Sequence, residues 1–233
     1  MPPFSKERFS VDYHKDLFDY TVLGKSYVLP LIDTESHTKE TILVNATLLF
    51  ATRGYGSVSM RDIADSIGIK PASLYNHFAS KDALWNAALE HAKSLYLIYF
   101  KHLTENLAKA DSFRSVLEII FHEPKMMANV FTNYAFAMVR AEQFRDPAAA
   151  EVADKTLFRF SIDSLRSCFD GCVEKGMVAP FDTEAVATII INSVLVAIDV
   201  AVQRSLGRDV SVDVGESLAA LERFLLRSLG GGE

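Results

Sequence analysis

Apolar positions recur three or four residues apart along most of the chain after residue 37. This spacing is typical of helices that bury one face, because 3.6 residues make one turn. Capping residues, glycines and prolines punctuate the pattern and set the expected helix ends. The predicted helices are Thr38–Arg53, Met60–Ile67, Pro71–His77, a long helix from Lys81, Phe113–His122, Lys125–Phe144, Asp146–Lys175, Thr183–Leu206 and Val212–Ser228. The expected fold class is therefore all-α.

Residues 1–37 lack this helical period. β-favouring residues flank Gly24 and Lys25, and glycine in the first central position suits a type II′ hairpin turn. Pro30 would restrict the second run to an edge strand. The segment is expected to be either a short β-hairpin or a flexible arm.

The stretch Ser59–Lys81 has the pattern of a helix-turn-helix. Ile63 and Ala64 lie on one face of a short helix, where a small residue lets a second helix cross closely. Gly68 suits a tight turn that needs a positive φ, and Leu74 lies on the next helix. In the DNA-binding form of this motif, the second helix enters the major groove.

Composition narrows the function classes. The chain has 233 residues, of which 49% are hydrophobic, so a folded core is expected. Neither a secretory signal nor an apolar run long enough to cross a bilayer is seen in the sequence, which indicates a cytoplasmic protein. The formal net charge is −6, but residues 38–81 carry a small basic excess, which fits a DNA-contacting module on an acidic body.

Residues 38–100 resemble the DNA-binding region of the tetracycline-repressor family. The resemblance lies in FATRGYGSVSMRDIA, in IGIKPASLYNHFASKDAL, and in the unbroken run into a long fourth helix. It implies an all-α homodimer in which three short helices bind DNA and a larger helical domain binds a small molecule and forms the dimer. It says nothing about the N-terminal extension.

The expected organisation is an extension over residues 1–37, a helix-turn-helix domain over 38–83, and a helical effector-binding and dimerisation domain over 84–233. Lys70, Ala72, Ser73 and Asn76 point away from the face of the recognition helix that carries Leu74, so they are candidates for base contacts. The remaining candidates would contact the DNA backbone. The roles of Tyr75, His77 and Lys81 are implied by the family resemblance. The candidate DNA-binding residues are Arg61, Lys70, Ala72, Ser73, Tyr75, Asn76, His77 and Lys81.

Aromatic residues and methionines on the middle helices could line an apolar pocket, or could simply form core. A pocket of this kind would suit a hydrophobic or aromatic effector. The candidate pocket residues are Tyr99, Leu103, Phe121, Met127, Phe131, Tyr134 and Met138, with Asn129, Asn133 and Arg140 as the few polar groups.

The helix Thr183–Leu206 is apolar around its circumference except at Asn192 and Asp199. A helix that is apolar all round is expected to be buried on both sides. This suits a helix that packs against its copy across a symmetric dimer interface, with residues 158–172 supplying the second helix of that interface. Asp199 would then need a buried partner or a place at the rim.

The sequence shows no catalytic, cofactor or metal motif, so an enzyme is disfavoured. Cys168 and Cys172 lie four apart on one helix face, where structural burial is expected over a redox pair or a metal site.

The favoured interpretation is a ligand-responsive transcriptional repressor that a small, largely apolar effector releases from a palindromic operator. Two alternatives remain: a DNA-binding protein of the same fold without an effector, and a helical protein-interaction module. The effector, the operator and the regulated genes cannot be named from the sequence.

Overall fold

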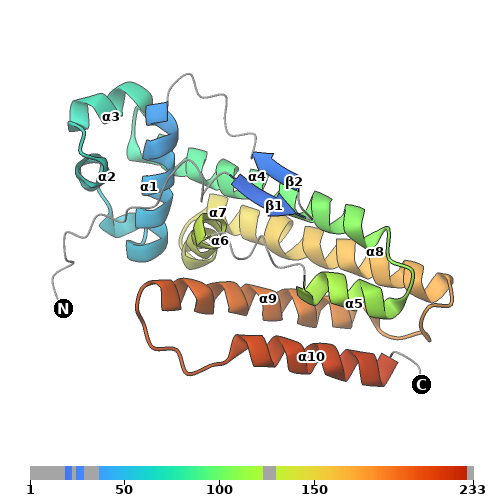
Figure 1. Cartoon of the computed structure of the whole chain (residues 1–233). Coiled ribbons are helices and arrows are strands. Elements are labelled where there is room, and N and C mark those ends of the chain that lie inside the picture. The colour runs from blue at the N-terminus through green and yellow to red at the C-terminus, as the bar shows by residue number, and fades with distance from the viewer. Residues whose placement is uncertain (1–18, 23–24, 29–36, 123–129, 230–233) are drawn as a thin grey trace.

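The computed structural model describes residues 19–22, 25–28, 37–122 and 130–229. Apart from one pair of short strands and the loops between elements, these residues are helical (Figure 1). The first helices are α1 (His37–Arg53), the short 3-10 helix η1 (Tyr55–Ser57), α2 (Met60–Ile67), α3 (Pro71–His77) and α4 (Lys81–Leu107). They are followed by α5 (Phe113–His122), α6 (Val130–Glu142), α7 (Pro147–Val152), η3 (Ala153–Phe160), α8 (Ser161–Glu174), α9 (Thr183–Ser205) and α10 (Val214–Leu229).

The hairpin that was one of two expectations for the N-terminal segment is present. Strand β1 (Asp19–Val22) pairs antiparallel with β2 (Lys25–Val28). Val22 pairs with Lys25, so Lys25 belongs to the strand and not to the turn. The sequence pattern had placed Lys25 in the turn, and Gly24 lies outside the described residues.

The elements α1, η1, α2 and α3 form what we call the head. Ser59 begins α2 with a capping box, because its hydroxyl accepts the Asp62 amide and the Asp62 carboxylate accepts the Ser59 amide. Pro71 occupies the first turn of α3, where its missing N–H costs little. Phe50 and Ile63 are fully buried, and they anchor the apolar faces of α1 and α2 in one core.

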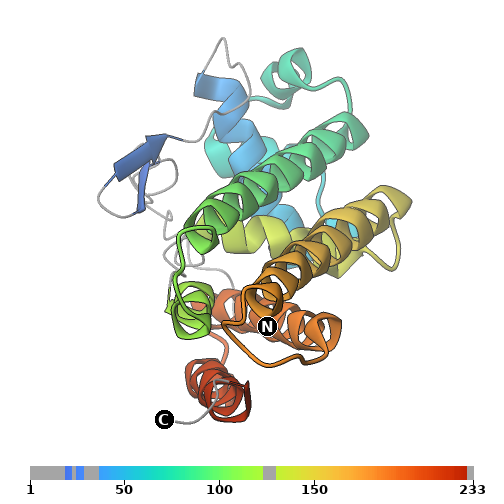
Figure 2. The same cartoon turned by 90° about the vertical axis from the view of Figure 1, so that its right-hand side faces the viewer.

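Helix α4 connects the head to the remaining helices, α5 to α10, which we call the body (Figure 2). The Ser80 hydroxyl caps its first turn by accepting the Ala83 amide at 3.0 Å. The head also meets the body directly, because α1 packs against α6 as well as against α2 and α4. Movement of α6 is therefore sterically coupled to the head.

The expected helix Asp146–Lys175 is continuous in the structure but changes its winding. Asp146 caps α7 as predicted, whereas Ala153–Phe160 is π-helical and leads directly into α8. The Tyr96 hydroxyl on α4 lies 3.2 Å from the Leu157 carbonyl in this segment, to which it donates. Sequence periodicity missed the π-helical segment because its residues still bury one side.

Helix α9 has one face in the core and one face exposed. Ile190 and Leu195 are buried, whereas Ile189 and Val196 are 51% and 47% exposed. In the single chain the expected burial on both sides is thus incomplete. Contrary to the sequence expectation, α9 is, among the described residues, long and apolar enough to cross a membrane by length and composition. Its buried side chains pack as those of a core helix do.

Candidate nucleic-acid interface and ligand cavity

Helix α3 turns a polar face to solvent at the outer end of the head. Leu74 is its only buried side chain and anchors the helix in the head core. Tyr75 is 51% exposed, and His77 is half-buried. The remaining candidates on and beside this helix are exposed: Lys70, Ala72, Ser73 and Asn76. The predicted base-contacting residues thus share an accessible surface.

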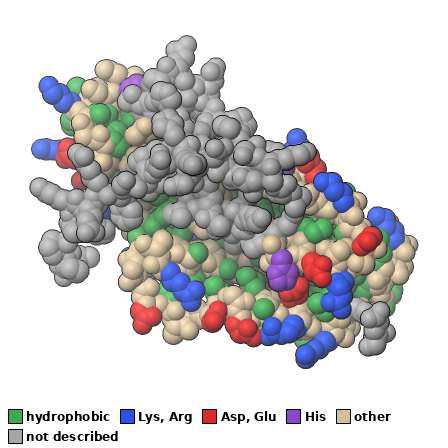
Figure 3. Space-filling model, viewed as in Figure 1, with side chains coloured by type: hydrophobic (Ala, Val, Ile, Leu, Met, Phe, Trp, Pro, Cys, Tyr) green, Lys and Arg blue, Asp and Glu red, His purple; other side chains and the backbone are tan. Residues whose placement is uncertain are grey.

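The turn before α3 holds this surface in place. Gly68 ends α2 with φ 73°, a left-handed conformation that glycine adopts without a Cβ clash. Arg61, in the first turn of α2, lies 3.8 Å from Asp65 at side-chain exposures of 82% and 65%. Because both side chains are in water, the ion pair is weak, and Arg61 stays accessible to an anion. Figure 3 shows basic side chains at this end of the molecule.

Lys81 stands at the start of α4, where the helix dipole favours an anion. Its Nζ lies 4.0 Å from the centroid of the Tyr55 ring, which is a cation–π distance. The Tyr55 hydroxyl donates a hydrogen bond to the Asp82 carboxylate. Burial, followed by this hydrogen bond, raises the pKa of Tyr55 to about 12, so the ring stays neutral under Lys81.

Tyr55 is a functional candidate that the sequence analysis missed. Its ring packs against Trp85 at 5.1 Å and against Phe50 at 5.6 Å between centroids. Its backbone N–H donates to Glu142 Oε1 at 2.8 Å, which links the head to the end of α6. The only available signal was an aromatic residue directly after Gly54.

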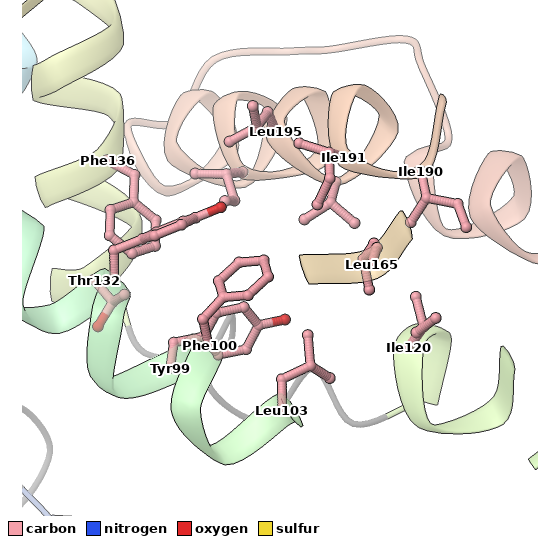
Figure 4. Close-up of a pocket in the computed structure, with 13 residues that line it drawn as sticks. Tyr99, Phe100, Leu103, Ile120, Thr132, Phe136, Leu165, Ile190, Ile191 and Leu195 are labelled. Atoms are coloured by element: carbon pink, nitrogen blue, oxygen red, sulfur yellow. The ribbon is translucent and has the colours of Figure 1, made fainter. Parts of the chain in front are cut away.

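A cavity of about 30 Å³ lies in the body between α4 and α9. Figure 4 shows Tyr99, Phe100 and Leu103 of α4 facing the α9 side chains across it. Ligand pockets usually measure about 300–1,000 Å³, whereas this space holds about two water molecules. The lining residues are Tyr96, Tyr99, Phe100, Leu103, Ile120, Thr132, Phe136, Leu165, Ile190, Ile191, Val194, Leu195 and Ile198.

The structure brings only some of the predicted pocket residues to this cavity. Tyr99 and Leu103 line it, whereas Phe121, Tyr134 and Met138 do not. Met138 is fully buried in the core, and the Tyr134 hydroxyl lies 2.9 Å from Ser205 Oγ. Ile120 of α5 and Thr132 and Phe136 of α6 line the cavity in their place, because these helices turn a different face inward from the predicted one. Met127, Asn129 and the side chain of Phe131 lie outside the described residues.

The cavity wall is uncharged in the described residues. Its Tyr96 hydroxyl is 2.6 Å from Ser161 Oγ, and burial raises the pKa of Tyr96 far above its ordinary range. Apart from the tyrosine hydroxyls and Thr132, the wall is hydrocarbon or aromatic. An apolar, uncharged molecule would fit this chemistry.

Asp199 has a charged partner, which was one of the two alternatives that the sequence left open. Its Oδ2 lies 2.7 Å from Arg140 Nη2, which joins α9 to α6. Burial raises the pKa of Asp199 above its ordinary range, and the Arg140 charge opposes that shift. Arg140 does not line the cavity, nor does Asn133, which is buried on the same helix α6.

The two cysteines are held as thiols. Burial raises the pKa of Cys168 to about 12, and it also raises the pKa of Cys172. Raised thiol pKa values oppose thiolate chemistry and metal binding. Among the described residues, no group of three metal-ligating side chains comes together.

Comparison with known proteins identifies the head. Residues 42–88 match the model of the bacterial regulatory proteins of the tetR family. The head is a DNA-binding domain of the tetR family. The match covers the helix-turn-helix and the start of α4, where the exposed basic and polar side chains lie. With this domain and relatives that are repressors, the protein is a DNA-binding transcriptional regulator and not an enzyme.

Relatives extend the similarity of this chain beyond the head into the body. It is 26% identical over 156 residues to the probable acrEF/envCD operon repressor of Escherichia coli K12, covering 66% of this chain and 70% of that protein. It is 29% identical over 154 residues to the HTH-type transcriptional regulator UidR of the same organism, covering 64% of this chain and 74% of UidR.

Solved structures share the fold of this protein. A transcriptional regulator from Mesorhizobium loti superposes with a TM-score of 0.61 at 21% identity, over 85% of this chain and all of the other. A regulator from Saccharomonospora viridis in complex with choline gives a TM-score of 0.63 at 20% identity, over 84% and 98% of the two chains.

Proposed function

We propose that this protein is a cytoplasmic homodimeric repressor that reads a two-fold operator through α3 and is released by a small uncharged, apolar molecule. The observation that carries the proposal is α3 itself. Leu74 alone anchors it, so its whole opposite face, including Asn76, is free to enter a major groove. Residues 38–83 would bind DNA, and residues 84–233 would bind the effector and form the dimer.

The exposed face of α9 supports the dimer. Ile189 and Val196 lie seven residues apart on one stripe, with Asn192 between them, and all three are exposed. Two copies of α8 and α9 packed about a two-fold axis would cover this stripe. Substitution of Val196 by Glu would place a charge there, and sedimentation equilibrium should then show monomer. An unchanged dimer would move the interface elsewhere.

The cavity supports an effector and limits its type. With no charged side chain among its described lining residues, it favours an uncharged ligand over an ionised one. Because it holds only about two waters, a larger ligand must push α9 away from α4 and α6. Choline and γ-butyrolactone appear in the names of structural relatives, so ligand type varies widely within this fold.

Selection against fragmented source DNA, at a stated salt concentration, tests the proposal. Full-length protein should enrich a two-fold motif. Asn76→Ala should lose roughly 1–3 kcal/mol of discrimination at one base position. Lys81→Ala should weaken all sequences alike and reduce the salt slope by about one unit. A folded dimer that enriches no sequence would refute operator binding by the unliganded protein.

A further inference from the structure

Glu142 is a buried carboxyl group at the boundary between the body and the head. It is 5% exposed and is the last residue of α6. Its Oε1 accepts the Tyr55 amide at 2.8 Å, and its backbone carbonyl accepts the amides of Arg145 and Asp146, both at 2.9 Å. The group is therefore fixed at its backbone and at its side chain.

The same helix forms part of the cavity wall. Thr132 and Phe136 line the cavity, and Glu142 follows Phe136 by six residues, about 9 Å along a rigid helix. A ligand that displaces the cavity end of α6 would therefore also displace Glu142.

Tyr55 continues this link to the DNA-facing end of α4. Its amide is held by Glu142, its hydroxyl binds Asp82, and its ring lies under the Lys81 ammonium group. One residue thus joins the end of α6 to the first turn of α4. A shift of the Tyr55 backbone would move the surface on which Lys81 rests.

We propose that Glu142 positions Lys81 for its DNA contact through Tyr55, so that the cavity-lining helix α6 sets the affinity of the head for DNA. This inference rests on the proposed function. Glu142 does not touch DNA in this scheme. It acts as a positioning residue whose displacement loosens a phosphate contact.

A double-mutant cycle tests the link. Glu142→Ala should weaken operator binding by about threefold to tenfold in the protein with Lys81, which is the lower part of the coupling expected for residues in one network. In the Lys81→Ala background the same change should cost less than about twofold, because the contact it positions is already gone. Equal losses in both backgrounds would overturn the proposal.

Two control variants separate positioning from general damage. Glu142→Gln keeps a side-chain oxygen that accepts the Tyr55 amide, so its affinity and salt slope should match those of the wild type. Glu222→Ala removes another buried carboxyl group, which binds His122 between α10 and α5, far from the head. It should lower thermal stability without changing operator affinity. A loss of affinity in either control would contradict the proposed role.

Trp85 provides a readout that needs no DNA. It is the only tryptophan of the chain, and its ring centroid lies 5.1 Å from that of Tyr55. Glu142→Ala should shift Trp85 emission and speed exchange of the Tyr55 amide, whereas Glu142→Gln should change neither. If the wild type binds no DNA, the proposed function fails. Trp85 emission and Tyr55 amide exchange would still test whether Glu142 holds Tyr55 in place. Unchanged signals in Glu142→Ala would refute it.

Discussion

The head and the body of this protein differ in how far apart in the sequence the interacting residues lie that shape each region. In the head, Ser59 and Asp62 close a capping box within one turn, and Gly68 ends the same helix. In the body, the cavity brings Tyr99 of α4 against Ile198 of α9. Local rules thus specify the head, whereas the body depends on how whole helices pack. The head should therefore respond to single local changes that leave the body intact.

The largest effect is expected from Leu74→Ala. Leu74 is the single buried side chain of α3, so its truncation should cost about 2–5 kcal/mol. Amide hydrogen exchange should accelerate most in α2 and α3, while α8 and α9 keep their protection. Equal acceleration throughout the chain would mean that head and body unfold as one unit.

His91, in the helix shared by both regions, should make stability pH-dependent. Burial lowers its pKa from 6.5 to about 4, so the unfolded chain binds more protons between these values. Its contribution is complete above pH 6.5 and is lost as the pH falls toward 4, by up to about 3 kcal/mol. Urea unfolding of the wild type and of His91→Met, at a series of pH values, measures this. Parallel profiles would exclude His91 as the source.

Gly54 and Gly68 both have positive φ, but alanine should be tolerated differently at the two positions. Gly68 is left-handed helical, with φ 73° and ψ 26°, so alanine there should cost about 1–2 kcal/mol, and its Cβ would meet nothing within 4 Å. Gly54 has φ 79° and ψ 150°, a conformation essentially confined to glycine, and its Cβ would lie 3.1 Å from Glu142 Oε1. Gly54→Ala should therefore have the lower melting temperature. The reverse order would show that both the Gly54 backbone and Glu142 adjust freely.

The smallest effect on stability is expected from Arg61→Ala. Arg61 and its partner Asp65 are both exposed, so the free energy of unfolding should change by less than about 0.5 kcal/mol. DNA binding should nevertheless weaken, with a salt slope lower by about one unit. An unchanged slope would remove Arg61 from the phosphate contacts.

The sequence predicted the head well because its signals lie close together. Ser59, Gly68 and Pro71 each act through the backbone of their own turn, so their roles follow from position. Leu74 and the polar residues around it also fall on the expected faces of α3. Tyr55 was missed because its importance comes from Glu142, which lies 87 residues away.

The body was predicted as a set of helices but not as a site. Phe136 and Met138 both belong to an apolar stretch of α6, and only packing decides that Phe136 faces the cavity while Met138 faces the core. For Asp199 the sequence left a buried partner or a place at the rim open, and its pairing with Arg140 could not be foreseen, since no local rule connects α9 with α6.

The π-helical segment Ala153–Phe160 has a consequence for the divergence of related regulators. Its wider turns take up an extra residue, so the segment can gain or lose one residue while the side chains of α8 keep their faces relative to α7. A duplicated gene that lost this residue would regain regular winding and still present the same α8 face to a second copy. Two sister regulators that differ by this one codon would therefore go on forming mixed pairs in the same cell.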